Sequence, residues 1–513
     1  MEYLVTREEM QQIERYTMEQ IKIPSIILME QAANSVLEEI EKEEGVCANI
    51  FILCGVGNNG ADGLALARIL HQKDFKNITI GIVGKEENGT KEWKLQFEII
   101  KKLGIPYLIE ETWIYTIDFH QYNCIVDGLF GIGLSREVKG SFYDVINNIN
   151  KAKKKVYAID VPSGVCTNTG KVLGIAIKAY KTITFGYEKL GCMLYPGTEY
   201  SGIIVVKKIG FPKGIHNIVH MSYYTYSLST NIETLMPKRF NYSNKGTFGK
   251  VAVFAGGKNM AGAAYMAGRA AYEIGAGLVK IVTCKANREI IQTLLPEALL
   301  TTYEPEKILW QQVKEAIDWA SVIIVGPGLG VEDYVKQLLQ FIINNSKVPI
   351  VLDADGINVL AKDKSMIENK QCQIVYTPHL KEFSRLNGET IADIQNDLLG
   401  HVHKFLQDNK FLQHKSDVLV CKDARTIVSS NNNLYYINQS GNHGMSTGGS
   451  GDVLSGIIGG LIAQGLEPLQ GAVCGVFIHG LAGNSACKEK GAYSMKATDI
   501  LEHISQVTKL SSK

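Results

Sequence analysis

One segment combines a carboxylate with a run of glycines at the expected start of a helix. The stretch from Gly441 to Gly456 reads GNHGMSTGGSGDVLSG. Free backbone N–H groups at a helix N-terminus attract anions, so this turn predicts an anion hole with Asp452 beside it. That pairing suits phosphoryl transfer, in which the hole holds the transferring group and Asp452 accepts the proton of the attacking hydroxyl. The alternative is that Asp452 only caps the helix.

A second glycine-rich segment, Gly55–Gly63, reads GVGNNGADG and lies between an expected strand and an expected helix. Glycines there let backbone N–H groups approach a phosphate, which predicts a nucleotide or dinucleotide ligand; a tight turn that needs glycine for steric reasons is the alternative. Its asparagines and Asp62, with Asp127 and Ser163 after neighbouring strands, are hard oxygen ligands of low total charge. They predict a monovalent cation such as potassium, or a hydrogen-bonded network without an ion.

The rest of the chain repeats a unit of a short apolar run, a glycine-rich turn and a helical pattern. This repeat is typical of a parallel sheet wrapped by helices, so we predict an α/β fold for both halves. Because ligands bind at the carboxyl ends of such strands, the loops that follow them should converge on one site. The apolar runs of the first half are 49–54, 78–83, 122–126 and 156–159. In the second half the strand-loop-helix pattern restarts at 251–257, 321–330, 349–356, 373–379 and 418–423.

The repeat lapses between Phe211 and Lys245, in a polar segment that contains several tyrosines and serines and is flanked by prolines. Such segments mark connections between domains. The two halves share architecture but no motif, which predicts different tasks. We expect a first domain at residues 1–215, a linker at 216–240 and a second domain at 241–513.

Composition excludes several function classes. The 513 residues contain 53 Lys and Arg against 52 Asp and Glu, a net charge of +1, so no global field would draw the chain to nucleic acid or to an anionic membrane. The ten cysteines include no Cys-x-x-Cys pair, which favours reduced, mostly buried thiols. Residues 1–10 are too charged for a secretory signal, which predicts a cytoplasmic protein. The uncharged stretch Pro468–Cys487 contains polar residues and glycines, which favours a buried helix over a membrane span.

Three ordered motifs in the first half resemble one known domain. GVGNNGADG, then DGLFGIGLSR from Asp127 and AIDVPSG from Ala158, are similar to the epimerase domain of the NAD(P)H-hydrate repair enzymes, over about residues 1–215. The resemblance implies a Rossmann-like three-layer sandwich, with Asp160 facing the nicotinamide as acid/base. Ala61 departs from the usual glycine. By the same resemblance, the substrate contacts are Asn58, Asn59, Gly60, Ala61, Asp62, Gly131, Ile132, Gly133, Leu134, Ser135, Arg136 and Glu137, and the potassium ligands are Asn59, Asp127 and Ser163.

The second half resembles the ribokinase-like superfamily, in the form found in ADP- or ATP-dependent NAD(P)H-hydrate dehydratases. Beside the Gly441–Gly456 run, the supporting motifs are AGG, GAGLV, GPGLG, LDADG and TPHLKEFSRL, spread over about residues 240–505. The resemblance implies magnesium and ADP or ATP. Asp423, His443 and Ser446 depart from the usual glycine, proline and alanine. The implied hydrate contacts are Gly328, His379 and Asp452, and the implied nucleotide contacts are Lys422, Asp423, Ala424, Arg425, Thr426 and Gly451.

Together the resemblances imply one enzyme that repairs hydrated NADH or NADPH, with epimerisation in the first domain and nucleotide-dependent dehydration of the S form in the second. The expected partners are small molecules, without nucleic acid or membrane, and the chain is a possible homo-oligomer. The alternative is a ribokinase-like small-molecule kinase with a non-catalytic dinucleotide-binding N-domain. His379 has an alternative role as a structural histidine, and Glu382 either positions a magnesium-bound water or favours the start of a helix.

Overall fold

Short apolar runs form the central strands of two sheets in a computed structural model, which describes residues 1–109, 111–407 and 417–509. In β2 (Ile50–Cys54) every residue is buried, as expected for a strand covered by helices on both faces. The chain divides into two compact units: Tyr3–Tyr223, called the N-unit, and Met1–Glu2 with the chain from Tyr224 onward, called the C-unit. The functional limits 1–215, 216–240 and 241–513 stay a prediction.

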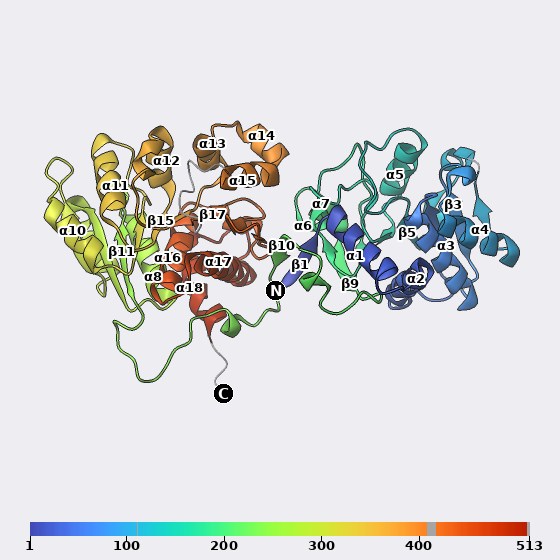
Figure 1. Ribbon diagram of the computed structural model, residues 1–513, viewed down its shortest axis with the longest axis horizontal. Coiled ribbons are helices and arrows are strands. Elements are labelled where there is room, and N and C mark those ends of the chain that lie inside the picture. The colour runs from blue at the N-terminus through green and yellow to red at the C-terminus, as the bar shows by residue number, and fades with distance from the viewer. Residues whose placement is uncertain (110, 408–416, 510–513) are drawn as a thin grey trace. The chain divides into compact units, whose positions relative to one another are not determined.

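The N-unit contains a parallel sheet in the order β4-β3-β2-β5-β6-β7-β9 (Figure 1). Separate apolar cores lie on its two faces, one with α2, α3 and α4 and one with α5, which confirms the three-layer sandwich. The order reverses between β2 and β5, where ligands bind in such sheets. Its elements are β1 (Glu2–Val5), α1 (Arg7–Glu19), α2 (Ser25–Glu41), β2, α3 (Asn58–Gln72), β3 (Ile78–Ile82), α4 (Lys91–Leu103), β4 (Tyr107–Leu108), β5 (Cys124–Gly128), α5 (Ser141–Ala152), β6 (Lys155–Ile159), β7 (Lys181–Phe185), β8 (Glu188–Lys189), α6 (Leu190–Met193), α7 (Gly197–Ser201) and β9 (Ile203–Lys207).

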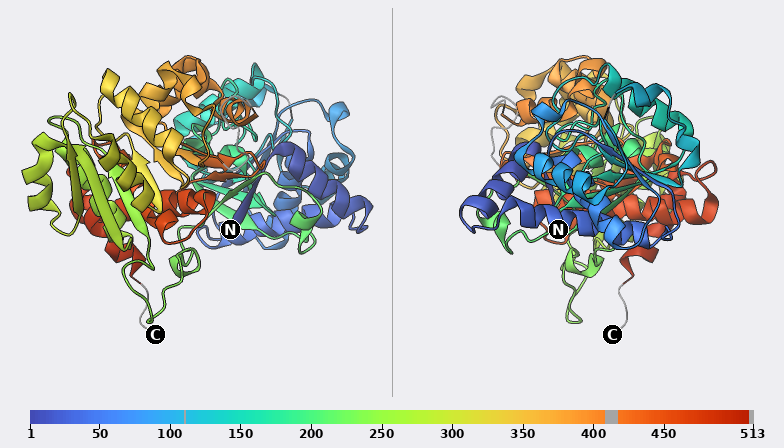
Figure 2. Two further views of the ribbon diagram at one scale, coloured as in Figure 1. Left: turned by 60° about the vertical axis from the view of Figure 1, so that its left-hand side comes forward. Right: turned by 90° about the vertical axis from the view of Figure 1, so that its right-hand side faces the viewer.

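Yellow-green strands of the C-unit lie side by side in the left view of Figure 2, and the strand order of this unit is β13-β12-β11-β14-β15-β16-β17-β18-β19. The pairing is parallel from β13 to β17 and antiparallel from β17 to β19, and the order reverses between β11 and β14. This architecture confirms the predicted α/β class. Its elements are β10 (Tyr223–Thr225), β11 (Lys250–Phe254), α8 (Ala261–Glu273), β12 (Leu278–Cys284), α9 (Arg288–Leu294), β13 (Leu299–Tyr303), α10 (Trp310–Trp319), β14 (Val322–Val325), α11 (Asp333–Asn345), β15 (Ile350–Leu352), α12 (Ala354–Lys362), β16 (Ile374–Tyr376), α13 (Leu380–Asn387), α14 (Ile391–Asn396), α15 (Leu398–Gln407), β17 (Val418–Cys421), β18 (Ile427–Ser430), β19 (Tyr435–Ile437), α16 (Ser450–Ala463), α17 (Pro468–Lys490) and α18 (Ala497–Thr508).

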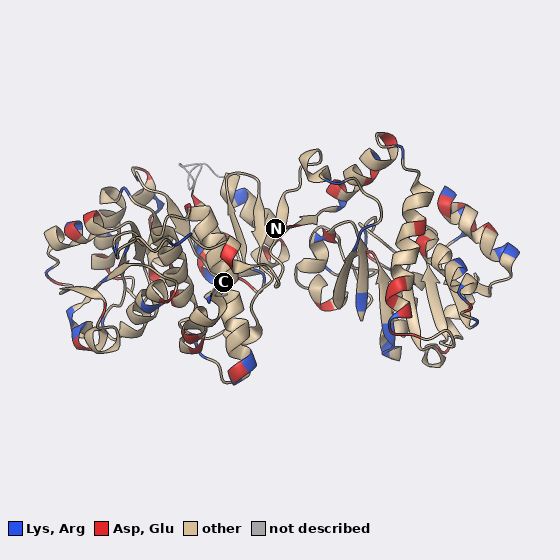
Figure 3. Cartoon of the chain, turned by 90° about the horizontal axis from the view of Figure 1, so that it is seen from below, with Lys and Arg blue, Asp and Glu red and all other residues tan. Residues whose placement is uncertain are grey.

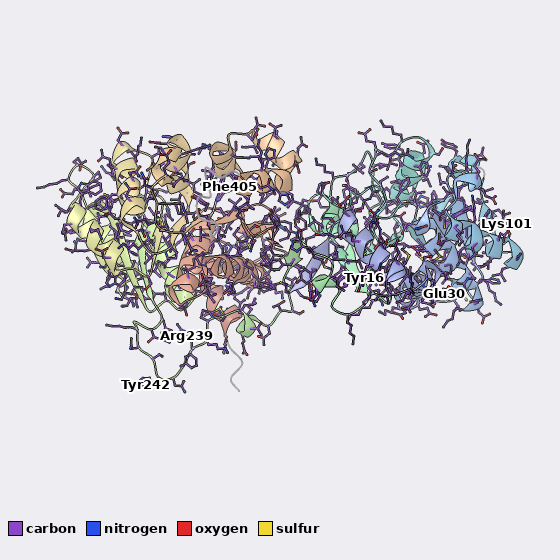
Figure 4. All side chains as sticks on the ribbon, in the orientation of Figure 1. Tyr16, Glu30, Lys101, Arg239, Tyr242 and Phe405 are labelled. Atoms are coloured by element: carbon purple, nitrogen blue, oxygen red, sulfur yellow. The ribbon has the colours of Figure 1, made fainter. Side chains whose placement is uncertain are left out.

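The prediction of a buried helix in the uncharged stretch from Pro468 is confirmed. The uncharged stretch from Pro468 forms the buried helix α17, and within the described residues no helix is long and apolar enough to cross a membrane. Tyr242, on the irregular segment before β11, is fully exposed (Figure 4). Lysine and arginine are interspersed with aspartate and glutamate over the described part of both units, as the near-zero net charge predicts (Figure 3).

Candidate active sites

The N-unit has a pocket of about 770 Å³ at the carboxyl edge of its sheet. Loops after β2, β5, β6 and β7 form one part of its lining, and residues of α1 and α2 form another. The pocket therefore lies where the strand order reverses between β2 and β5, and its volume fits a ring-containing ligand. The predicted substrate residues that line it are Asn58, Asn59, Asp62, Gly131, Ile132, Gly133, Leu134, Ser135, Arg136 and Asp160.

Three predicted substrate residues lie outside the described lining of this pocket. Gly60 and Ala61 are buried in the first turn of α3, and a Cβ at Gly60 would come within 1.8 Å of the Gly55 carbonyl oxygen. A glycine is thus required at Gly60 for steric reasons. Glu137 is exposed, and its carboxylate pairs with Lys139 at 2.8 Å.

Asp160 occupies a left-handed backbone position, φ +66°, directly after β6. Its Oδ1 accepts hydrogen bonds from Lys189 Nζ at 2.5 Å, Thr184 Oγ1 at 3.0 Å and the Phe185 amide at 3.3 Å. No described residue donates to Oδ2, so this oxygen is available to a ligand in the pocket. The strained backbone is typical of a functional position.

Lys189 is a site residue that sequence reasoning missed. Its side chain is 1% exposed, and its ammonium also donates to Thr184 Oγ1 and to the Phe185 carbonyl. A buried lysine is stable only when paired, so Lys189 fixes the orientation of Asp160. The sequence shows only a single lysine shortly after the apolar strand that ends at Phe185. No motif spacing connects this lysine to Asp160.

The predicted potassium ligands come together beneath the pocket. Ser163 donates from Oγ and from its amide to the two carboxylate oxygens of Asp127, at 2.6 and 2.8 Å. Burial raises the pKa of Asp127 to about 6, against hydrogen bonds from Ser163 and Leu129 that lower it. A Cβ at Gly131 would lie 3.2 Å from the side chain of Asn59, whose buried Nδ2 has no hydrogen-bond partner among the described residues. The carboxylate, hydroxyl and amide oxygens of Asp127, Ser163 and Asn59 are the ligand type that fits a weakly charged cation, whereas Asn59 Nδ2, as a donor, would not bind it.

In the C-unit the helix α16 begins after Gly449, which has φ +93° and supplies no side-chain cap. Asp452 is the third residue of the helix, so the alternative that Asp452 caps it is wrong. No described residue hydrogen-bonds to the Asp452 carboxylate. The amides of Gly451 and Asp452, which have no partner among the described residues, therefore lie beside a carboxylate without a hydrogen bond, an arrangement that suits phosphoryl transfer.

Asp353 follows β15 and accepts hydrogen bonds from three side chains at this edge of the sheet. In the sequence it stands out only as part of the LDADG motif. It is 1% exposed and accepts from Lys422 Nζ at 2.8 Å, Thr377 Oγ1 at 2.8 Å and Ser455 Oγ at 2.6 Å. A Cβ at Gly451 would lie 3.3 Å from Lys422 Nζ. Asp353 thus holds the lysine cation against the N-terminus of α16, where an anion would bind.

Burial, followed by the charge of Asp353, raises the pKa of Asp452 to about 7, although Lys422 lowers it. A carboxylate with such a pKa is suited to accept a proton near neutral pH. His479 is 8% exposed, and its Nε2 lies 3.4 Å from Ser450 Oγ in the first turn of α16. Burial, and then the charge of Lys422, lowers its pKa to about 4, so His479 is neutral at this site.

The His379 side chain caps a helix, which fits the alternative role, while its predicted hydrate contact stays a prediction. Its Nδ1 accepts from the amides of Lys381 and Glu382, and its own amide donates to Glu382 Oε2 at 2.9 Å, so the two residues form a capping box at α13. Glu382 therefore favours the helix start. The His379 side chain is half exposed, and its backbone bridges to Lys422, which keeps it near the cluster.

The remaining predicted contacts of the C-unit lie on loops at the same edge. The carbonyl of Gly328 accepts from the Gly257 amide at 2.6 Å, which joins the loops after β14 and β11. In the predicted nucleotide loop, Asp423 and Ala424 are exposed, whereas Lys422, Arg425 and Thr426 are partly buried.

The two units thus define a two-domain α/β enzyme with a separate site at each strand edge. A family described as YjeF-related protein N-terminus matches residues 25–191, and one described as NAD(P)H-hydrate dehydratase matches residues 251–506. The bifunctional NAD(P)H-hydrate repair enzyme of Moorella thermoacetica is 35% identical over 98% of this chain and 96% of its own, and that of Coxiella burnetii is 34% identical over 98% and 99%. The chain belongs to the family of bifunctional NAD(P)H-hydrate repair enzymes.

Among solved structures, the ADP/ATP-dependent NAD(P)H-hydrate dehydratase of Bacillus subtilis, co-crystallised with ATP and Mg²⁺, is 26% identical to this chain. It covers 54% of this chain and 95% of its own length, with a TM-score of 0.48. A ribokinase-like superfamily protein of Enterococcus faecalis is 25% identical, with 56% and 96% coverage and a TM-score of 0.48.

Proposed function

We propose that the N-unit pocket interconverts the R and S hydrates of NADH or NADPH, and that the C-unit cluster dehydrates the S hydrate at the expense of ADP or ATP. The observation that carries this proposal is the match to bifunctional repair enzymes along 98% of the chain. It is supported by the placement of Asp160 and Asp452 in two separate units, each with carboxylate oxygens open to a ligand. The epimerase would supply the dehydratase with the S form from either hydrate.

In the N-unit, Asp160 would act as acid/base at the hydroxylated ring carbon. Lys189 holds Oδ1, which leaves Oδ2 for the substrate or for water. Asn58, Asn59, Asp62 and the 131–136 loop would bind the dinucleotide along the pocket. Bound potassium would supply a fixed positive charge beneath this loop, with Asn59, Asp127 and Ser163 as its ligands.

In the C-unit, Asp452 would take the proton of the ring hydroxyl, whose oxygen attacks the terminal phosphoryl group of the nucleotide. The bond from that phosphorus to the bridging oxygen breaks, and AMP or ADP leaves with its electrons. The first-turn amides of α16 and the Lys422 cation would stabilise the charge on the transferring oxygens. Phosphate then leaves with the electrons of the C–O bond, and the neighbouring carbon loses a proton to form the dihydronicotinamide. Phosphorylation helps because hydroxide is a poor leaving group. Magnesium would arrive with the nucleotide.

Potassium dependence tests the proposed cation site. We expect the full chain to interconvert the hydrates without any nucleotide, and to lose at least about tenfold in rate when potassium is replaced by choline, since a buried carboxylate would lose its counterion. Chromatography of the two hydrates measures this rate. An unchanged rate in choline would mean that Asp127 and Ser163 form only a hydrogen-bonded network.

Removal of the Lys422 cation tests the nucleotide site. We expect Lys422→Ala to weaken ATP binding about tenfold or more and hydrate binding far less, because the ammonium lies beside the anion-binding turn. Calorimetric titration of each ligand separates the two effects, and Lys381→Ala on the exposed face of α13 is the matched control. Equal losses for both ligands would contradict the assignment.

A cytoplasmic location and a homo-oligomer stay predictions.

A further inference from the structure

Helix α1 presents one face to the N-unit pocket, and that face contains a carboxyl group with no assigned role. Met10, Glu14 and Met18, spaced by four residues, line the pocket together with Gln11. Residues four apart lie on the same side of a helix, so Glu14 stands between two methionines. Glu14 forms no hydrogen bond or ion pair with another described residue, so nothing except a ligand engages its carboxyl group.

The pocket brings this carboxyl group close to the Asp160–Lys189 pair. Burial, and then the negative charge of Asp160, raises the pKa of Glu14 to about 7, whereas Lys189 lowers it. A substantial fraction of Glu14 is therefore protonated at neutral pH. The charged residues that line the pocket are Glu14, Asp62, Glu92, Arg136, Asp160 and Lys189.

We propose that Glu14 is a second acid/base residue of this pocket, which protonates the departing ring hydroxyl while Asp160 serves the water that adds to the opposite face. The proposal rests on the epimerase function proposed above. Inversion of a carbon that bears a hydroxyl and a ring nitrogen needs the C–O bond to break and form again on the other face. Two carboxyl groups from different elements suit this task, since one must give a proton and the other must take one.

The step balances within the site. The C–O electrons leave with the oxygen, which takes the Glu14 proton and departs as water, while the nitrogen lone pair forms a double bond to the carbon. Water then adds to the other face, its excess proton passes to Asp160, and the electron pair returns to nitrogen. Exchange with solvent restores both carboxyl groups, and the reverse epimerisation exchanges their roles.

Asp62 is the other unpaired carboxyl group in the pocket, but it fits this role less well. It belongs to the first turn of α3, next to the glycine loop predicted to hold the dinucleotide. Burial and the charges of Asp160 and Glu14 raise its pKa well above the usual value. An acid that must give up its proton in every turnover works best with a pKa near the working pH, which favours Glu14.

The test compares Glu14→Gln, Glu14→Asp and Asp62→Asn in the full chain, with Glu19→Gln at the exposed end of α1 as the matched control. The probe is the R hydrate of NADH without nucleotide, and the rate of S formation is measured from pH 5 to pH 9. We expect Glu14→Gln to lower kcat about 10²-fold with little change in KM. In wild type, kcat should fall as pH rises through the pKa of Glu14, and this fall should be absent from Glu14→Gln.

Each outcome bears on the proposal. If Glu14→Gln keeps kcat within a few-fold of wild type, or if Asp62→Asn alone removes the alkaline fall, Glu14 is not the acid. If Glu14→Gln is unstable to heat, Glu14→Asp decides, because it must retain about tenfold more turnover than the Gln variant. A wild-type chain that does not interconvert the hydrates would instead contradict the epimerase function itself.

Discussion

Asp452→Asn should lower dehydratase turnover by about 10² to 10⁴-fold, the range for loss of a general base. Asparagine keeps the shape of the side chain at the start of α16 but cannot take the hydroxyl proton. Because no described residue hydrogen-bonds to Asp452, the substitution breaks no hydrogen bond among the described residues, and the fold should be preserved. The rate of NADH formation from the S hydrate and ATP measures the effect.

The pH profile and the second activity serve as controls for Asp452. A general base works as its carboxylate, and the pKa of Asp452 is raised to about 7, so wild-type turnover should rise as pH increases through that value and fall below it. Epimerisation should be unchanged in the variant, since its site lies in the other unit. Turnover within a few-fold of wild type would exclude the phosphoryl-transfer role.

Asp160→Asn should reduce epimerisation by about 10² to 10⁴-fold, because the amide neither takes nor gives the required proton. The substitution also leaves the buried Lys189 without its anionic partner, so some loss of N-unit stability is expected. Thermal unfolding measured beside the rate separates these effects. Dehydration of pure S hydrate should continue at the wild-type rate, and full epimerisation by the variant would refute the acid/base role.

The sequence predicts the parts of the sites that are continuous in the chain. The Thr6 and Glu9 pair predicts the start of α1, and the structure confirms its capping box. The serine before the next apolar stripe predicts an N-cap at Ser25, but Ser25 is the first residue of α2, and its hydroxyl donates to Glu92 Oε1 at 2.8 Å. A serine before an apolar stripe does not distinguish these two positions, because both lie at the helix start.

Residues from separate elements escape such reasoning. Only the fold brings together residues that lie far apart in the sequence. The pairs are Lys189 with Asp160, Glu14 with Asp62, and Asp353 with Lys422. In the sequence, Glu14 is one of several acidic residues on an amphipathic helix. Only the structure shows that it lines the pocket. At His379 the structure adds a role that its motif does not predict, because Nδ1 accepts from two helix amides, while the predicted hydrate contact stays a prediction.

The most direct test of bifunctional repair is the yield from an equal mixture of R and S NADH hydrates supplied with ADP or ATP and Mg²⁺. The dihydronicotinamide absorbance reports product, and chromatography reports the remaining hydrates. We predict that the wild-type chain returns the whole mixture to NADH, whereas Asp160→Asn stops after the S half. Accumulation of a stable phosphorylated product, or no NADH from either hydrate, would contradict the account.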